Sequence, residues 1–193
     1  SKSVKSLSNH EIEIKDGKII NIAPSINSDC KILDAKNSII TPGFIDSHTH
    51  PIFASNRSDE FEKRNLGKSY NQIESEGGGI LNSVFKLRQK SEDELFDLCF
   101  KKVGKFLDFG TTTIEAKSGY GLTYKDEIKS LNVIKRLNDK LKIDLVPTFM
   151  GAHAIPSEYK GSQYKYVDLI CEKMIPEIAS QKLAIFCDVF CEK

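Results

Sequence analysis

The chain has 193 residues, of which 39% are hydrophobic and 28% are charged, proportions that fit a folded domain and exclude a disordered chain. Its formal net charge is only +1, which gives no electrostatic reason to expect nucleic acid or an acidic membrane as a partner. The polar opening SKSVKSLSNH shows no signal peptide, and no apolar run is long enough to span a membrane. The five cysteines form no C-x-x-C pair, so we expect reduced thiols and a cytoplasmic protein.

Two segments near the start of the chain carry strand signals. Residues 10–24 alternate apolar and polar side chains around an Asp-Gly pair at 16–17, which predicts a tight β-hairpin. Residues 38–47 form an almost continuous apolar run, interrupted by a Pro-Gly pair at 42–43. This run predicts a buried strand.

Helices and strands alternate through the rest of the chain. Ser91 and Glu94 have the spacing of a capping box, and the amphipathic helix that they open is expected to end at Gly110. The β-branched residues 111–117 then predict a strand. The following elements are a helix capped at Thr123, a strand at 143–150, a helix at 166–179 kinked near Pro176 and a strand at 184–190.

This alternation predicts an α/β fold with a parallel sheet. About four β/α units would form half of an eight-stranded (β/α)8 TIM barrel, or an open doubly wound sheet. The triplet at 77–79 matches neither G-x-G-x-x-G nor a P-loop, so it is either a flexible loop or a backbone platform close to a ligand. The long segment 51–90 follows the first barrel strand, where long loops usually carry function.

Two histidines lie one residue apart directly after the apolar run. Residues two apart on a strand share a face, so His48 and His50 point together, and Asp46 joins them. At the carboxyl end of a barrel strand such a pair could bind one divalent metal through two ring nitrogens, although a hydrogen-bonded structural pair is the alternative. A catalytic metal needs at least three protein ligands. His153 also follows a predicted strand and could be a ligand or a substrate contact, whereas His10 lies in the hairpin.

Longer segments resemble a known family. The stretch PGFIDSHTHPIFASNR resembles the opening strand of the metal-dependent amidohydrolases. Further segments resemble the imidazolonepropionase family within that superfamily, in order and spacing: EFEKRNLGKSYNQIESEGGGI, EAKSGYGL, FMGAHAIPSEY and YVDLICEKMIPEI with FCDVFCE. H-x-H is common to the superfamily, whereas the KSGYGL and GAHA segments are much more selective. The resemblance covers about residues 10–193.

The resemblance implies a fold and a reaction. The reaction is hydrolysis of the cyclic amide of 4-imidazolone-5-propanoate to N-formimino-L-glutamate, a step of histidine degradation in the cytoplasm. The fold is a β/α barrel with a small β-sandwich built from both chain ends. Residues 1–40 would then be part of the composite sandwich domain, and residues 41–193 the first half of the barrel, incomplete in this chain. A homodimer is expected for the complete enzyme.

The resemblance also implies roles for single residues. His48 and His50 would bind one metal ion, zinc or iron, and Arg57 would bind the substrate carboxylate. Tyr70 and Tyr120 would contact the substrate in the pocket. His153 would bind substrate and take part in catalysis without ligating the metal. The chemistry agrees, because a bound metal lowers the pKa of water to about 7 and polarises a carbonyl, and an arginine fork matches a carboxylate. Each residue has an ordinary alternative: a surface arginine, a packed tyrosine or a loop-capping histidine.

Two further expectations concern the chemistry of the site. Glu115 and Lys117 share one face of the strand at 111–117, and we expect an ion pair there, because the resemblance is to one-metal enzymes that need no modified lysine. The family's remaining metal histidine, metal aspartate and catalytic glutamate lie downstream of the matched region. We therefore expect a truncated piece that is inactive alone.

Two alternatives to this function stay open. The first is another amidohydrolase, such as a ring-base deaminase, whose substrate would offer no propanoate to Arg57. The second is a non-catalytic binding protein on the same fold. A ring-base deaminase would not need Arg57, and a non-catalytic binding protein would not need a metal.

Overall fold

The computed structural model describes residues 5–191, so the first four residues of the predicted sandwich piece and the last two of the predicted half barrel lie outside it. The chain divides into two compact units, residues 1–41 and 42–193, which are described one at a time. No helix in the described part of the chain is both long and apolar enough to cross a membrane.

The first unit contains the predicted hairpin. Strands β1 (Glu11–Lys15) and β2 (Lys18–Ala23) pair antiparallel. Between them Asp16 and Gly17 have positive φ values of 51° and 72°, as a two-residue type I′ turn requires. The hairpin prediction is therefore confirmed, whereas its place in a β-sandwich stays a prediction.

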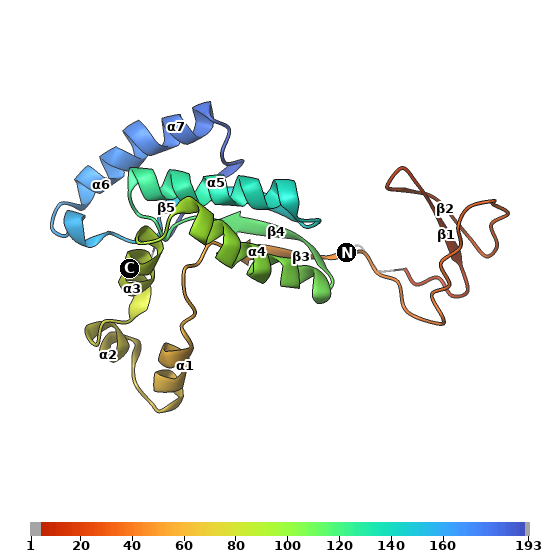
Figure 1. Ribbon diagram of the computed structural model, residues 1–193, viewed down its shortest axis with the longest axis horizontal. Helices are drawn as coiled ribbons and strands as arrows, with labels where there is room; N and C mark the ends of the chain where they lie inside the picture. Colours follow the sequence, from red (N-terminus) through yellow and green to blue (C-terminus); the bar gives the residue numbers. More distant parts are fainter. Residues whose placement is uncertain (1–4, 192–193) are drawn as a thin grey trace. The chain divides into compact units, whose positions relative to one another are not determined.

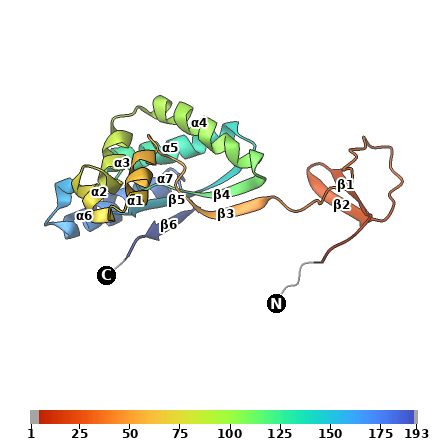
Figure 2. The same cartoon turned by 90° about the horizontal axis from the view of Figure 1, so that it is seen from below.

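The second unit is built on one parallel sheet with the strand order β3-β4-β5-β6, of which β3, β4 and β5 are labelled in Figure 1 and all four in Figure 2. These strands are Phe44–Thr49, Thr111–Lys117, Asp144–Ala152 and Phe186–Val189. Helices α4 (Glu92–Asp108) and α5 (Tyr124–Lys140) lie along the same side of the sheet (Figure 2). The predicted α/β class with a parallel sheet is confirmed. Strands in sequence order with these helices on one side agree with a partial barrel, because a doubly wound sheet reverses its strand order and carries helices on both faces.

The core lies between the sheet and these two helices. The capping box is present, with Ser91 Oγ accepting from Glu94 N–H at 3.2 Å and Glu94 accepting from Ser91 N–H at 2.9 Å. Fully buried residues recur at helical spacing on each inner face, namely Leu95, Cys99 and Val103 of α4 and Leu131, Ile134 and Leu137 of α5. Burial of each large aliphatic side chain stabilises the fold by about 1.5–3 kcal/mol.

The strand predicted from the apolar run differs from the observed one. β3 begins at Phe44, after the Pro-Gly pair, and Phe44 and Ile45 are 61% and 72% exposed. The expectation of a buried strand is wrong because β3 has only β4 as a neighbour in the described sheet. Gly43 packs closely against that neighbour: a Cβ placed there would lie 2.8 Å from Thr112 Cβ.

Two other segments are more structured or less regular than expected. The segment at 51–90 contains α1 (Ser58–Asn65), α2 (Tyr70–Ser75) and α3 (Gly79–Arg88). The helix predicted at 166–179 is three pieces: α6 (Gln163–Leu169), a π-helix (Ile170–Met174) and α7 (Ile175–Ser180). The wide π turns come directly before Pro176, whose missing N–H and bulky ring disturb a regular α-helix at that point.

Candidate active site

Polar side chains from three strands meet at the carboxyl edge of the sheet. His48 lies near the end of β3 and His50 directly after it, Tyr120 follows β4, and His153 follows β5. Because the carboxyl ends of parallel strands lie at one edge of a sheet, the three segments converge. Four of the predicted site residues are thereby brought together.

The rings form one aromatic cluster. His50 and His153 stack with their centroids 4.6 Å apart and their planes 10° from parallel. Tyr120 meets both rings edge-on, at 5.3 Å from His50 and 5.1 Å from His153. His48 lies 5.7 Å from His50. Phe53 packs edge-on against Tyr120 at 5.1 Å, so one wall of the cluster is apolar.

Backbone carbonyls fix the orientation of two of these rings. His50 Nδ1 lies 3.0 Å from Ser118 O, and His153 Nδ1 lies 2.8 Å from Gly119 O. A carbonyl oxygen only accepts, so each Nδ1 donates and each Nε2 is left for the site. Burial, with a smaller contribution from the nearby His153, lowers the pKa of His50 to about 4. His50 is thus a neutral imidazole at neutral pH, the form that binds a metal.

The fit to a metal ion is partial. A neutral His50 with a free Nε2, beside His48, offers the donor atoms that zinc or iron prefers. Asp46 accepts a hydrogen bond from the backbone N–H of His48 at 3.3 Å. Among residues 5–191, however, no three or more His, Cys, Asp or Glu side chains are grouped to hold an ion. Among the described residues, His48 and His50 thus offer two candidate donors and no complete ligand set.

Arg57 and Tyr70 lie beside this cluster, in the segment that follows β3. Arg57 directly precedes α1 and directs its guanidinium onto Glu60, with Nε donating at 2.9 Å and Nη2 donating to the same oxygen. This hydrogen bond raises the pKa of Arg57, and the nearby Tyr120 and Tyr70 act in the same direction. Tyr70 opens α2 and is 48% exposed. A polar cavity of about 200 Å³ beside Arg57 is also lined by Glu60 and Gly78.

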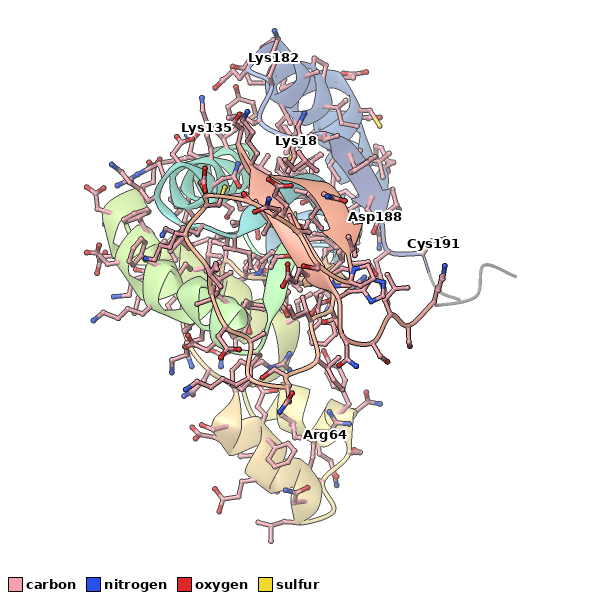
Figure 3. All side chains as sticks on the ribbon, turned by 90° about the vertical axis from the view of Figure 1, so that its right-hand side faces the viewer. Lys18, Arg64, Lys135, Lys182, Asp188 and Cys191 are labelled. Carbon is pink, nitrogen blue, oxygen red and sulfur yellow. The ribbon has the colours of Figure 1, made fainter. Side chains whose placement is uncertain are left out.

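A buried lysine links β4 to β6. Lys117 Nζ lies 2.9 Å from Glu115 Oε1 and 2.6 Å from Asp188 Oδ2, and Thr148 Oγ1 donates to Glu115 at 2.8 Å. The predicted ion pair is present. Asp188, labelled in Figure 3, was not predicted. The hydrogen bond from Lys117, together with one from the backbone N–H of Val189, lowers the pKa of Asp188.

Sequence reasoning also missed two carboxylates that act through hydrogen bonds. Glu60 holds Arg57, and Glu127 accepts backbone N–H groups of the loop that carries Tyr120. Their signal in the sequence is weak, because an acidic residue in the first turn of a helix is common on dipole grounds alone. Only their partners distinguish them from ordinary surface acids.

The chain is similar in sequence to several curated proteins. The imidazolonepropionase of Clostridium tetani is 49% identical over 163 residues, which cover 84% of the chain and 39% of that protein. That of Brevibacillus brevis is 48% identical, with 86% and 39% covered. That of Streptococcus gordonii is 43% identical over 198 residues, with 100% and 47% covered. The chain is related to the imidazolonepropionases.

The relation confirms the resemblance inferred from the motifs. The chain spans about two fifths to one half of the length of the imidazolonepropionases that it matches. No protein-family model matches the chain. The roles of the individual site residues rest on the geometry above and stay predictions.

Proposed function

We propose that the protein containing this chain is an imidazolonepropionase, which hydrolyses the cyclic amide of 4-imidazolone-5-propanoate to N-formimino-L-glutamate in histidine degradation. The observation that carries this proposal is the convergence of His50, His153 and Tyr120 at one sheet edge, in a chain related to the imidazolonepropionases. The sheet would be the first half of a (β/α)8 barrel and the hairpin a piece of a β-sandwich. We expect a cytoplasmic enzyme that assembles as a homodimer.

His48 and His50 are the proposed ligands for one zinc or iron ion, together with ligands outside the described residues. When bound, the ion would acidify a water molecule and polarise the ring carbonyl. His50 contributes a neutral Nε2, because its Nδ1 is held by Ser118 O and burial opposes its protonation. The stacked His153 presents its own Nε2 beside it.

His153 is the proposed catalytic and substrate-binding histidine. Its Nδ1 is held by Gly119 O, so Nε2 can accept a hydrogen bond from a ring N–H of the substrate. Once protonated at Nε2, the ring can donate to the oxyanion that develops on the amide carbonyl. Tyr120, edge-on to both histidines, would bound the substrate on one side.

Arg57 is the proposed partner of the substrate's propanoate. Its hydrogen bonds to Glu60 use Nε and Nη2, which leaves Nη1 for a second carboxylate. Tyr70, which acts on the pKa of Arg57 together with Tyr120, would line the same region. An anionic tail at Arg57 distinguishes imidazolone propanoate from an uncharged ring base.

The test is Arg57→Ala in the complete protein, assayed with 4-imidazolone-5-propanoate. Loss of a charge-assisted hydrogen bond, worth roughly 1.5–3 kcal/mol, should lower kcat/KM about 10- to 100-fold, mainly through KM. The matched control is Arg64→Ala, an exposed arginine at the end of α1 (Figure 3), which should leave both constants unchanged. An Arg57→Ala enzyme with an unchanged KM would exclude this substrate orientation.

A further inference from the structure

Glu127 is a fully buried carboxylate in the first turn of α5. It accepts three backbone N–H groups of the loop between β4 and α5: Gly119 at 3.1 Å, Gly121 at 2.8 Å and Leu122 at 2.8 Å. Burial raises the pKa of Glu127, and the donors around the carboxylate oppose that rise. A carboxylate without water is costly to bury, so this arrangement needs every one of its donors.

The same loop holds the two stacked histidines through its carbonyls. Ser118 O accepts from His50 Nδ1, and Gly119 O accepts from His153 Nδ1. Gly119 is therefore bonded on both sides, with its N–H on Glu127 and its C=O on His153. A shift of the loop would move both acceptors at once.

The loop conformation is one that the chain would not adopt without support. Leu122 has a φ of 53°, a left-handed conformation that a leucine rarely occupies. Gly119 has a φ of 105°, and a Cβ there would lie 2.7 Å from Met150 O. The N–H groups of both residues end on Glu127, which makes this carboxylate the common support of the strained positions.

We propose that Glu127 is a positioning residue, which sets the orientation and tautomer of His50 and His153 by holding the loop at 118–122. Its relevance to catalysis rests on the proposed function, whereas its effect on the two rings does not. The simpler alternative is that Glu127 only stabilises the start of α5. That alternative predicts a loss of stability with no change at the rings.

The test measures the tautomers of His50 and His153 directly, by long-range ¹H–¹⁵N NMR of this chain labelled in histidine. In the unmodified chain both rings should carry their proton on Nδ1. In the Glu127→Gln variant an NH2 group replaces one of the two acceptor oxygens. This group cannot accept a hydrogen bond, and it faces a backbone N–H donor of the loop. The Nδ1–H to Nε2–H ratio should then fall by about tenfold, the effect expected for the loss of roughly one hydrogen bond.

The matched control is Ile134→Val, a buried position two turns further along the same helix, which should lower stability and keep the carboxylate of Glu127. It should leave both tautomers unchanged. If Glu127→Gln does not fold, Glu127→Asp keeps the charge but shortens the side chain, and it should shift the ratio in the same direction. Unchanged tautomers in a folded Glu127 variant, or an Nε2–H ring in the unmodified chain, would overturn the proposal.

The kinetic counterpart uses the complete protein. Glu127→Gln should lower kcat for imidazolone propanoate at least tenfold, and KM should rise as well, because His153 and Tyr120 are also proposed substrate contacts. A raised KM with an unchanged kcat would contradict a role at the histidines. If the complete protein does not hydrolyse this substrate at all, the proposed function fails, and the tautomer measurement still decides the role of Glu127.

Discussion

Single residues of the site are held mainly by bonds to the backbone or to partners far away in the sequence. His48, His50, Tyr120 and His153 could be placed from sequence because each lies at or just after the carboxyl end of a strand, and parallel strands bring these ends together. The roles of the Glu127 and Asp188 carboxylates could not be predicted from the sequence. Glu127 is recognised by its N–H donors, and Asp188 by a lysine 71 positions away.

Lys117 offers a prediction at this scale. Its side chain is 5% exposed and balances Glu115 and Asp188, so Lys117→Met should leave two carboxylates facing each other. Because Asp188 is 43% exposed and solvent screens it, we expect a loss of about 2 kcal/mol in the free energy of unfolding, less than for a fully buried pair. The measurement is chemical denaturation. Lys135→Met, on the exposed side of α5 (Figure 3), is the control and should change it by less than about 0.5 kcal/mol.

The same pair should give a pH dependence. The hydrogen bond from Lys117 lowers the pKa of Asp188 below its ordinary value of 3.8. A lowered folded-state pKa stabilises the fold above the unfolded-state value, and this contribution is lost as the pH falls through the folded-state pKa. The stability of the unmodified chain should therefore drop more steeply below about pH 4 than that of Lys117→Met.

At the scale of elements, the sequence predicted the features that depend on neighbouring residues. It did not predict the features that depend on tertiary packing. The type I′ turn and the capping box depend on neighbouring residues, so the sequence predicts them. The exposure of β3 depends on which strands lie beside it, and an apolar run looks the same in a central strand and at an edge. The π-helix before Pro176 is likewise not visible in the periodicity, because a proline in a helical pattern can produce either a kink or wider turns.

Two glycines give opposite predictions for alanine. At Gly121 a Cβ would lie 2.5 Å from Asp126 C and 2.7 Å from Glu127 N, so Gly121→Ala must displace the backbone at the start of α5. It should destabilise the chain by at least about 2 kcal/mol. At Gly104, inside α4, the nearest atom is 3.9 Å away, and Gly104→Ala should stabilise by roughly 0.5–1 kcal/mol. Thermal unfolding of both variants checks this, and equal effects would contradict the packing at Gly121.

At the scale of the whole molecule, the described sheet ends on two strands with one neighbour each. Phe44 and Ile45 on β3, and Phe186 and Val189 on β6, are all more than half exposed. Open strands with apolar side chains are sites where further strands pair. This agrees with a sheet that continues in a longer protein, and with relatives about twice the length of the chain.

The activity of the chain alone is a prediction at this scale. Two imidazoles bind a metal weakly, and the described residues group no third ligand with them. We expect the 193-residue chain not to turn over 4-imidazolone-5-propanoate, even with added zinc or iron. Mass spectrometry of substrate and product measures this turnover. The complete protein under the same conditions is the positive control. Clear turnover by the chain alone would show that two ligands suffice.

The bonds between Glu127 and the loop at 118–122 also set a limit on protein engineering. A designer who wishes to transplant the histidine site onto another β/α scaffold must move residues 118–127 as one block, since the loop without its carboxylate would not keep its shape. An insertion or deletion inside that block would separate the two carbonyls from the rings that they hold. Changes of substrate range are better sought by substituting Arg57 or Tyr70, the proposed substrate contacts of the segment at 51–90.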